Sequence, residues 1–285
     1  MTYIYVLSLR DNNLFLQMTV ISATLLRKIS PQAKILIAID EITDLKKYSV
    51  EYELLLNLNV EILIVKTGFS NCVLSSRFIK LSLPNLVNEQ FWYLDSDTLP
   101  LINTDSTQIA GDIGMVRDLN RDASDFILNE NRVANCKAMN WPIPEYPYCN
   151  SGVMFLKCNS QVKELFQQAH EIWLSACNEG INCGDQLPLN IAVQQMPNIN
   201  VTLLDDSYNA QIRAVPRLAP KAKILHIFSG SLAKHNDTLL HVLIDNLRDK
   251  GVLRTDILDR LLESRNPWVK QARQWWLFPI RKILS

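Results

Sequence analysis

Short apolar runs alternate with segments of helical periodicity along the first hundred residues. Four near-continuous runs, typical of parallel strands covered on both faces, lie at residues 3–9, 34–40, 60–66 and 91–94. Three segments between them are expected to be helical: Leu14 to Pro31, residues 45–58 and residues 72–87. Pro31 is expected to end the first helix, and Pro84 to interrupt the third. This order predicts an α/β fold with a mostly parallel sheet built by right-handed crossovers.

The second half of the chain continues the alternation less regularly. Strands are expected at residues 111–117, 148–157, 201–204 and 224–228. Helices are expected at residues 160–176, 185–195, 237–250 and 254–264. Residues 118–145 are polar with little apolar periodicity, which indicates a long loop of the lid or binding type. We therefore expect one α/β domain over residues 1–236, followed by C-terminal helices and a tail over residues 237–285.

Composition excludes several classes of function. The 29 basic and 29 acidic residues cancel, so no overall field draws the protein to nucleic acid. The six cysteines form no C-x-x-C pair, which argues against a zinc ribbon or a disulfide scaffold. The N-terminus lacks the basic start of a signal peptide, and no apolar run is long enough for a spanning helix. We expect a cytoplasmic protein with reduced thiols.

The apolar run at residues 91–94 ends in Asp95-Ser96-Asp97, which places two carboxylates one residue apart at a strand end. In open α/β sheets, ligands bind in the crevice beyond the carboxyl ends of the strands, so such a pair can hold a cation. The spacing alone is common, and taken by itself it favours a strand-ending turn with solvated acids. Other residues must decide between the two interpretations.

Polar residues at other predicted element ends favour a site. Arg77 and Lys80 are three positions apart on one helix, which gives either a solvated basic face or a counter-charge for an anion in the same crevice. Asp185 and Gln186 begin a helix, where capping alone accounts for them. His226 ends a late strand. Together with Asp95 and Asp97 it offers two hard oxygens and one imidazole, a set that suits Mn²⁺ somewhat better than Mg²⁺.

These residues resemble the motifs of glycosyltransferase family 8, which includes glycogenins and bacterial lipopolysaccharide galactosyl- and glucosyltransferases. Tyr93-Leu94-Asp95-Ser96-Asp97-Thr98 is similar to the Asp-x-Asp signature of the glycosyltransferase A fold, and the later motifs follow in the family order. The whole resemblance extends from about Ser8 to Lys234. The last motif departs from the family pattern, because Gly230 and Lys234 lie farther from His226 and His235-Asn236 replaces Pro-Trp. The resemblance implies a Rossmann-like glycosyltransferase A domain.

Carried over by position, the resemblance also implies roles for individual residues. Donor-binding residues would be Ser8, Asp11, Asn12, Arg77, Lys80, Asp95, Ser96, Ser151, Gly152, Gly230 and Lys234. Asp185 would bind hydroxyls of the donor sugar, and Gln186 would lie near the reacting anomeric carbon. Asn150 belongs to a turn that lies near the donor sugar. Asp95, Asp97 and His226 would be the metal ligands.

The activity implied is the transfer of a hexose, with retention of configuration, from a nucleotide sugar to a glycan or glycolipid hydroxyl. UDP-sugar is the donor expected, with Mn²⁺ or Mg²⁺ as cofactor and lipopolysaccharide or surface polysaccharide synthesis as the setting. Two alternatives stay open. A nucleotidyltransferase would also place carboxylates and a metal beside a nucleotide, although no glycine-rich loop follows the first strand here. A non-catalytic sugar-nucleotide-binding module could keep the fold without needing all three metal ligands.

The last 18 residues, Trp268 to Ser285, carry four cations and no acid among interfacial aromatic residues. Such a segment suits the headgroup region of an anionic membrane, and a lipid-linked saccharide acceptor on the inner face would explain it. A helix that packs against the domain or against a second copy explains the same pattern. The expected location is cytoplasmic, with peripheral contact to the cytoplasmic membrane through this segment.

Overall fold

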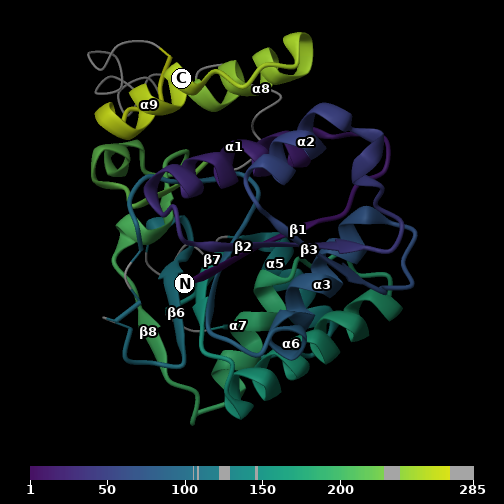
Figure 1. Ribbon diagram of the computed structural model, residues 1–285. Coiled ribbons are helices and arrows are strands. Elements are labelled where there is room, and N and C mark those ends of the chain that lie inside the picture. Colours follow the sequence, from purple (N-terminus) through teal and green to yellow (C-terminus); the bar gives the residue numbers. More distant parts are fainter. Residues whose placement is uncertain (105, 108, 122–128, 145–146, 228–237, 270–285) are drawn as a thin grey trace.

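The computed structural model describes all residues except 105, 108, 122–128, 145–146, 228–237 and 270–285 (Figure 1). In the described part of the chain, seven strands form one sheet in the order β3-β2-β1-β4-β7-β6-β8. These strands are β1 (Thr2–Leu7), β2 (Lys34–Asp40), β3 (Glu61–Val65), β4 (Phe91–Leu94), β6 (Ile113–Arg117), β7 (Cys149–Leu156) and β8 (Val201–Leu203). The mostly parallel sheet is confirmed, with β7 as the strand that runs antiparallel to both neighbours.

Helices cover both faces of this sheet, as the two-sided apolar strands require. They are α1 (Leu14–Ile29), α2 (Ser49–Asn57), α3 (Cys72–Leu86), α6 (Ser160–Asn178) and α7 (Gln186–Gln195). The α1 and α2 pair lies on one face and the α3, α6 and α7 group on the other (Figure 1). Alternate residues of β1 divide between the two cores: Tyr3 and Tyr5 join the core under α1, whereas Ile4 and Val6 join the core under α3 and α6.

A small second sheet lies beside the main one. It consists of β5 (Thr98–Pro100), β10 (Ile224–His226) and β9 (Ala210–Gln211), with β10 in the middle. The β5 strand begins four residues after β4 ends, so the chain leaves the main sheet and enters the small one across Asp95 to Asp97. The antiparallel pairing sets His226 opposite Thr98. This register brings His226 next to the Asp-x-Asp segment, although more than a hundred residues separate them in the sequence.

The helices α8 (Leu239–Lys250) and α9 (Thr255–Ser264) form an outer layer over α1 (Figure 1). A third core joins this layer to α1 and to the small sheet, and it includes Met18 and Leu25 of α1, Leu225 of β10 and Leu240 of α8. The α1 helix is therefore apolar on two sides, one toward the main sheet and one toward α8. No helix in the described ranges combines the length and hydropathy that crossing a bilayer requires.

Three local predictions were wrong. The polar segment 118–145 contains a helix, α5 (Glu130–Ala138), whose weak periodicity follows from its single buried residue, Cys136. The expected helix over residues 45–58 is two elements, because a 3₁₀ turn at Leu45–Lys47 ends at Tyr48 before α2 begins. Pro84 does not interrupt α3, which continues to Leu86; it stands in the last turn, where the following residues complete the helix.

Candidate functional site

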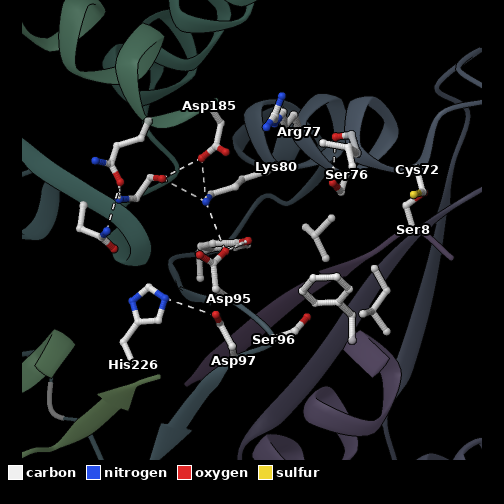
Figure 2. Close-up of a pocket in the computed structure, with 18 residues that line it drawn as sticks. Ser8, Cys72, Ser76, Arg77, Lys80, Asp95, Ser96, Asp97, Asp185 and His226 are labelled. Carbon is white, nitrogen blue, oxygen red and sulfur yellow. Dashed lines mark hydrogen bonds and ion pairs between the residues drawn. The ribbon is translucent and has the colours of Figure 1, made fainter. Parts of the chain in front are cut away.

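A cleft of about 510 Å³ opens beyond the carboxyl ends of β1 and β4, between them and the first turns of α3 and α7. Most of the residues that the sequence singled out line it: Ser8, Arg77, Lys80, Asp95, Ser96, Asp97, Asn150, Ser151, Asp185, Gln186 and His226. Figure 2 shows them converging from opposite walls, with Lys80 and Asp185 on one side and Asp97 and His226 on the other. Residues separated by more than two hundred positions therefore share one site.

Asp95, Asp97 and His226 each offer one ligand atom, and these atoms lie within 4.8 Å of one another. The backbone of the small sheet fixes this approach, since the amide of Ile227 donates to the carbonyl of Asp97 at 3.1 Å. The imidazole Nε2 of His226 lies 3.3 Å from Oδ1 of Asp97 (Figure 2). Burial opposes the charge of the imidazole, but the carboxylate of Asp97 outweighs it and raises the pKa of His226.

Lys80 is a buried cation between two carboxylates. Its Nζ lies 2.7 Å from Asp185 and 3.3 Å from Asp95, and it also donates to the hydroxyl of Ser151 at 3.2 Å (Figure 2). Desolvation opposes the ammonium charge, yet the two carboxylates raise the pKa of Lys80 above its ordinary value. Desolvation also opposes the charge of Asp185, and Lys80 outweighs it and lowers the pKa of that carboxyl. Both groups are therefore charged near neutral pH.

The side chain of Asp95 is divided between two tasks. Its Oδ1 accepts from Lys80 and from the hydroxyl of Tyr93, which stands two residues earlier on β4. Burial, and then the negative charge of Asp95, keep the pKa of Tyr93 well above its ordinary value, so the phenol remains a donor. Its Oδ2 faces Gly152. One oxygen is thus held by two donors, while the other lies beside Gly152.

Gly152 leaves the space in which the cluster sits. A Cβ at this position would lie 2.4 Å from Cε1 of His226, 2.7 Å from Oδ2 of Asp95 and 2.9 Å from Oδ1 of Asn150. Contacts this short require the histidine and the carboxylate to move, and the position of His226 at the end of β10 restricts such a movement. The donor set, its spacing and this open space together fit a divalent cation of the Mn²⁺ or Mg²⁺ type.

We expect Gly152→Ala to weaken Mn²⁺ binding about tenfold or more and to lower the free energy of unfolding by about 1–3 kcal/mol, the usual cost of overpacking a tight site. Binding of Mn²⁺ is measured by the loss of the free-ion electron paramagnetic resonance signal, and stability by urea unfolding. Gly184→Ala is the matched control, since its Cβ would meet only the amide of Gln186 at 4.0 Å. Unchanged Mn²⁺ binding in Gly152→Ala would place the cation elsewhere.

Asn150 and Gln186 form the remaining wall. The amide of Asn150 donates to Oδ1 of Asp118 at 3.0 Å and to Oε1 of Gln186 at 3.1 Å. The same Gln186 oxygen accepts the backbone N–H of Ser151 at 3.3 Å. Asp185 precedes α7 as its N-cap residue, but its carboxylate bonds to Ser151 at 2.7 Å and to Lys80, and it makes no capping bond to its own helix. Capping is therefore not the explanation of Asp185.

No protein-family model matches the chain, and no curated protein matches its sequence. Solved structures do match its fold. The galactosyltransferase LgtC in complex with donor and acceptor sugar analogs superposes with a TM-score of 0.52 at 15% identity, over 97% of this chain and 99% of that chain. Apo GlyE of Streptococcus pneumoniae TIGR4 gives 0.55 at 16%, over 95% and 65%. The bifunctional WbbM gives 0.52 at 16%, over 80% of this chain and 45% of that one.

The chain has the glycosyltransferase A fold. Between 14% and 16% identity, these likenesses establish the architecture, and they confirm the fold that the sequence motifs implied. This chain spans 45% of the length of WbbM, and that protein carries further regions beyond the match. The roles assigned to individual site residues by resemblance stay predictions.

Within this glycosyltransferase A fold, two of the expected donor-binding residues, Asp11 and Asn12, do not line the cleft, and two others cannot be compared with it. The Asp11 side chain is fully exposed and pairs with Lys47 at 3.8 Å, and Asn12 caps the amide of Leu14 at 2.7 Å, so neither lines the cleft. Gly230 and Lys234 lie outside the described residues. Arg77 does line the cleft, but its guanidinium donates to Oδ1 of Asn182 and to the carbonyl of Cys183 at 3.0 and 3.1 Å.

Ser8 lines the far end of the cleft and is held by Asp40, whose Oδ2 accepts its hydroxyl at 2.6 Å. Asp40 is fully buried at the end of β2 and forms an ion pair with Arg10 at 2.8 Å. Desolvation opposes its charge, but Arg10 and the hydroxyl donors lower its pKa to about 2. The loop after β1 is therefore fixed by a buried carboxylate that the sequence analysis did not single out.

Sequence reasoning missed two other participants, Tyr93 and Asn209. Tyr93 could have been found, because residues two apart on a strand share a face, and its hydroxyl is therefore directed toward Asp95. Asn209 lies in a polar segment that follows β8, ends a 3₁₀ turn at Asp206–Asn209, and is 0% exposed. No periodicity marks such a residue, and only the packing of the small sheet brings it to His226.

Proposed function

We propose that this protein is a metal-dependent glycosyltransferase that moves a hexose from a nucleotide sugar, with UDP as the nucleotide, to the hydroxyl of a saccharide. The observation that carries the proposal is the cluster of Asp95, Asp97 and His226, which opens into a cleft at the strand ends of a glycosyltransferase A fold. LgtC, which shares the fold, has been seen with donor and acceptor sugar analogs. A cleft of about 510 Å³ has room for a nucleotide sugar, since ligand sites span roughly 300–1,000 Å³.

The charged and the neutral side chains of the cleft are proposed to have different roles. A divalent cation bound by Asp95, Asp97 and His226 would neutralise charge on the donor diphosphate as the sugar–phosphate bond breaks. Lys80 holds Asp95 and Asp185 in place and adds a positive charge beside the cluster. Asp185 and Asn150 line the cleft next to Gln186, and we propose that they bind sugar hydroxyls. Positioning and electrostatics, rather than a covalent step, account for most of the proposed catalysis.

Retention of configuration is part of the proposal, and the geometry of Gln186 bears on how it would occur. The Oε1 of Gln186 accepts from both Asn150 and the amide of Ser151. An amide oxygen that already accepts two hydrogen bonds is a weak nucleophile. We therefore favour attack by the acceptor hydroxyl on the face from which the diphosphate leaves, with the departing phosphate oxygen taking the hydroxyl proton. Gln186 would then act by holding the sugar.

The acceptor is proposed to be a glycan or a glycolipid, in lipopolysaccharide or surface polysaccharide synthesis. The basic aromatic tail suggested contact with an anionic membrane, but all of it after Val269 lies outside the described residues. That contact stays a prediction from the sequence. The same holds for the donor-binding role of Gly230 and Lys234, which also lie outside the described residues.

The test is donor hydrolysis with a panel of UDP- and GDP-sugars, followed by mass spectrometry, first with Mn²⁺ and then with excess EDTA. We expect one UDP-hexose to release UDP with Mn²⁺ and the release to stop with EDTA. Release of pyrophosphate from a nucleoside triphosphate and sugar phosphate would indicate a nucleotidyltransferase instead. Binding of UDP without turnover of any sugar, in the presence of saccharide acceptors, would indicate a binding module.

A further inference from the structure

A chain of buried amides runs from the backbone of β7 to the imidazole of His226. Oδ1 of Asn150 accepts the backbone N–H of Gly152 at 2.9 Å. The same oxygen accepts Nδ2 of Asn209 at 2.9 Å. Oδ1 of Asn209 lies 2.9 Å from Nδ1 of His226. Asn150, Asn209 and His226 are 4%, 0% and 3% exposed, so protein groups rather than bulk water decide the orientation of each amide.

The first amide has one orientation only. A backbone N–H can donate but not accept, so the atom of Asn150 that faces Gly152 must be its oxygen. The opposite end agrees, because the other atom of the amide faces the carboxylate of Asp118 at 3.0 Å and must therefore be the NH₂ group. A rotated Asn150 would set two donors against each other at one end and two acceptors at the other.

The orientation of the second amide follows from the first. Since Asn150 presents an oxygen, the atom of Asn209 that faces it must be the NH₂ group, and the carbonyl oxygen of Asn209 must face His226. An acceptor at 2.9 Å from Nδ1 requires that Nδ1 carry a hydrogen. In the neutral imidazole, Nε2 then bears the lone pair, and Nε2 is the atom that lies toward Asp97.

We propose that Asn209 is a positioning residue that fixes His226 as the Nδ1–H tautomer, so that Nε2 presents its lone pair to a cation held by Asp95 and Asp97. This inference rests on the metal site of the proposed function but concerns a different residue. In metal-binding histidines the N–H of the second ring nitrogen commonly donates a hydrogen bond to an oxygen, which fixes the tautomer. Loss of that oxygen costs about 10–100-fold in metal affinity. Asn209 would supply that oxygen, and Gly152 and Asp118 would fix its orientation through Asn150.

The first measurement is the tautomer of His226 in uniformly ¹⁵N-labelled, full-length protein without added metal, by two-bond ¹H–¹⁵N correlation. The pH is raised until the His226 signals stop moving, so that the imidazole is neutral. Loss of the signals in His226→Gln assigns them. We expect the Nδ1–H tautomer for His226, and the Nε2–H tautomer would overturn the inference.

Two variants then separate positioning from general packing. Asn209→Leu removes the acceptor, and we expect Nε2–H at His226 and Mn²⁺ affinity, measured for the metal alone, lowered about 10–100-fold. Asn209→Asp keeps an oxygen toward Nδ1, and we expect Nδ1–H to persist. A residue that merely fills space would change neither the tautomer nor its dependence on the acceptor. Retention of Nδ1–H with Mn²⁺ affinity within about twofold of wild type in Asn209→Leu would overturn the inference.

Asn209→Asp also covers the case in which the leucine variant fails to fold. Nε2–H in a folded Asn209→Asp protein would overturn the inference, because the acceptor would be present without effect. The tautomer is read without substrate, so its outcome is separate from that of the proposed function. A protein with Nδ1–H at His226 that hydrolyses no nucleotide sugar would reject the proposed function and leave the role of Asn209 intact.

Discussion

Asp97→Asn should reduce UDP-sugar hydrolysis by at least about 1,000-fold, since a cation lost from the diphosphate removes several kcal/mol of transition-state stabilisation. Asp97 is 7% exposed, and its carboxylate lies within the same 4.8 Å cluster as the ligand atoms of Asp95 and His226. The amide of asparagine keeps the size of the side chain but offers a neutral and weaker oxygen. Hydrolysis is measured as released UDP at saturating Mn²⁺, and Mn²⁺ binding is measured in parallel.

Asp259→Asn is the matched control for this substitution. Asp259 is an exposed aspartate on α9 that pairs with Lys28 at 2.7 Å, and surface pairs of this kind contribute about 0–1 kcal/mol. Its removal should leave both Mn²⁺ binding and hydrolysis near the wild-type values. If Asp97→Asn keeps hydrolysis within about tenfold of wild type, a cation at this cluster is not what stabilises the leaving diphosphate.

The sequence predicted the element order well because strands and helices leave a periodic record. The apolar runs of β1, β2 and β4 and the stripe of α1 each appear in the structure near the expected bounds. The failures have a common cause. The α5 helix buries one residue, and Tyr48 divides a helical pattern that is continuous in hydrophobicity. Where few apolar contacts form, local hydrogen bonds decide the conformation, and the hydrophobic pattern does not predict it.

The candidate site was predictable to the same extent. Strand ends and helix starts located Asp95, Asp97, Asp185 and His226, and the structure brings them to one cleft. What periodicity cannot supply is pairing across the sheet. The antiparallel register of β5 and β10 joins His226 to Asp97, and the position of Asn209 depends on the same small sheet. Nor could spacing show that Lys80 and Arg77 have different partners. Lys80 donates to Asp95 at the end of β4, whereas Arg77 donates to Asn182.

Of these two cations, Lys80 is the one whose loss should lower the free energy of unfolding more, because it pairs with two carboxylates. Lys80→Met keeps the length of the side chain but leaves Asp185 and Asp95, 18% and 31% exposed, without their shared counter-charge. Removing one partner of a buried ion pair costs about 3–5 kcal/mol, and the partial exposure of Asp95 places the expected loss near 3 kcal/mol. Lys163→Met is the control, because the ammonium of that partly exposed lysine donates to the neutral amide oxygen of Asn88 at 3.3 Å. Urea unfolding at pH 7 gives both values.

The pH dependence of that loss separates charge from packing. In the wild type the pKa of Asp185 is lowered from 3.8, so its contribution to stability is present above that value and is lost as the pH falls through the lower folded value. In Lys80→Met the burial of Asp185 is no longer balanced, and its folded pKa should rise above 3.8. The deficit relative to wild type should then be largest near neutral pH and shrink as the pH falls toward 4, where protonation removes the unpaired charge.

Adding Asp185→Asn to Lys80→Met should recover part of the stability lost at pH 7, because the second substitution also removes the unpaired charge. A deficit that does not change with pH, or that the second substitution does not reduce, would mean that Lys80 stabilises the cleft through the contact of its ammonium with the ring of Tyr93, whose centre lies 4.7 Å from Nζ.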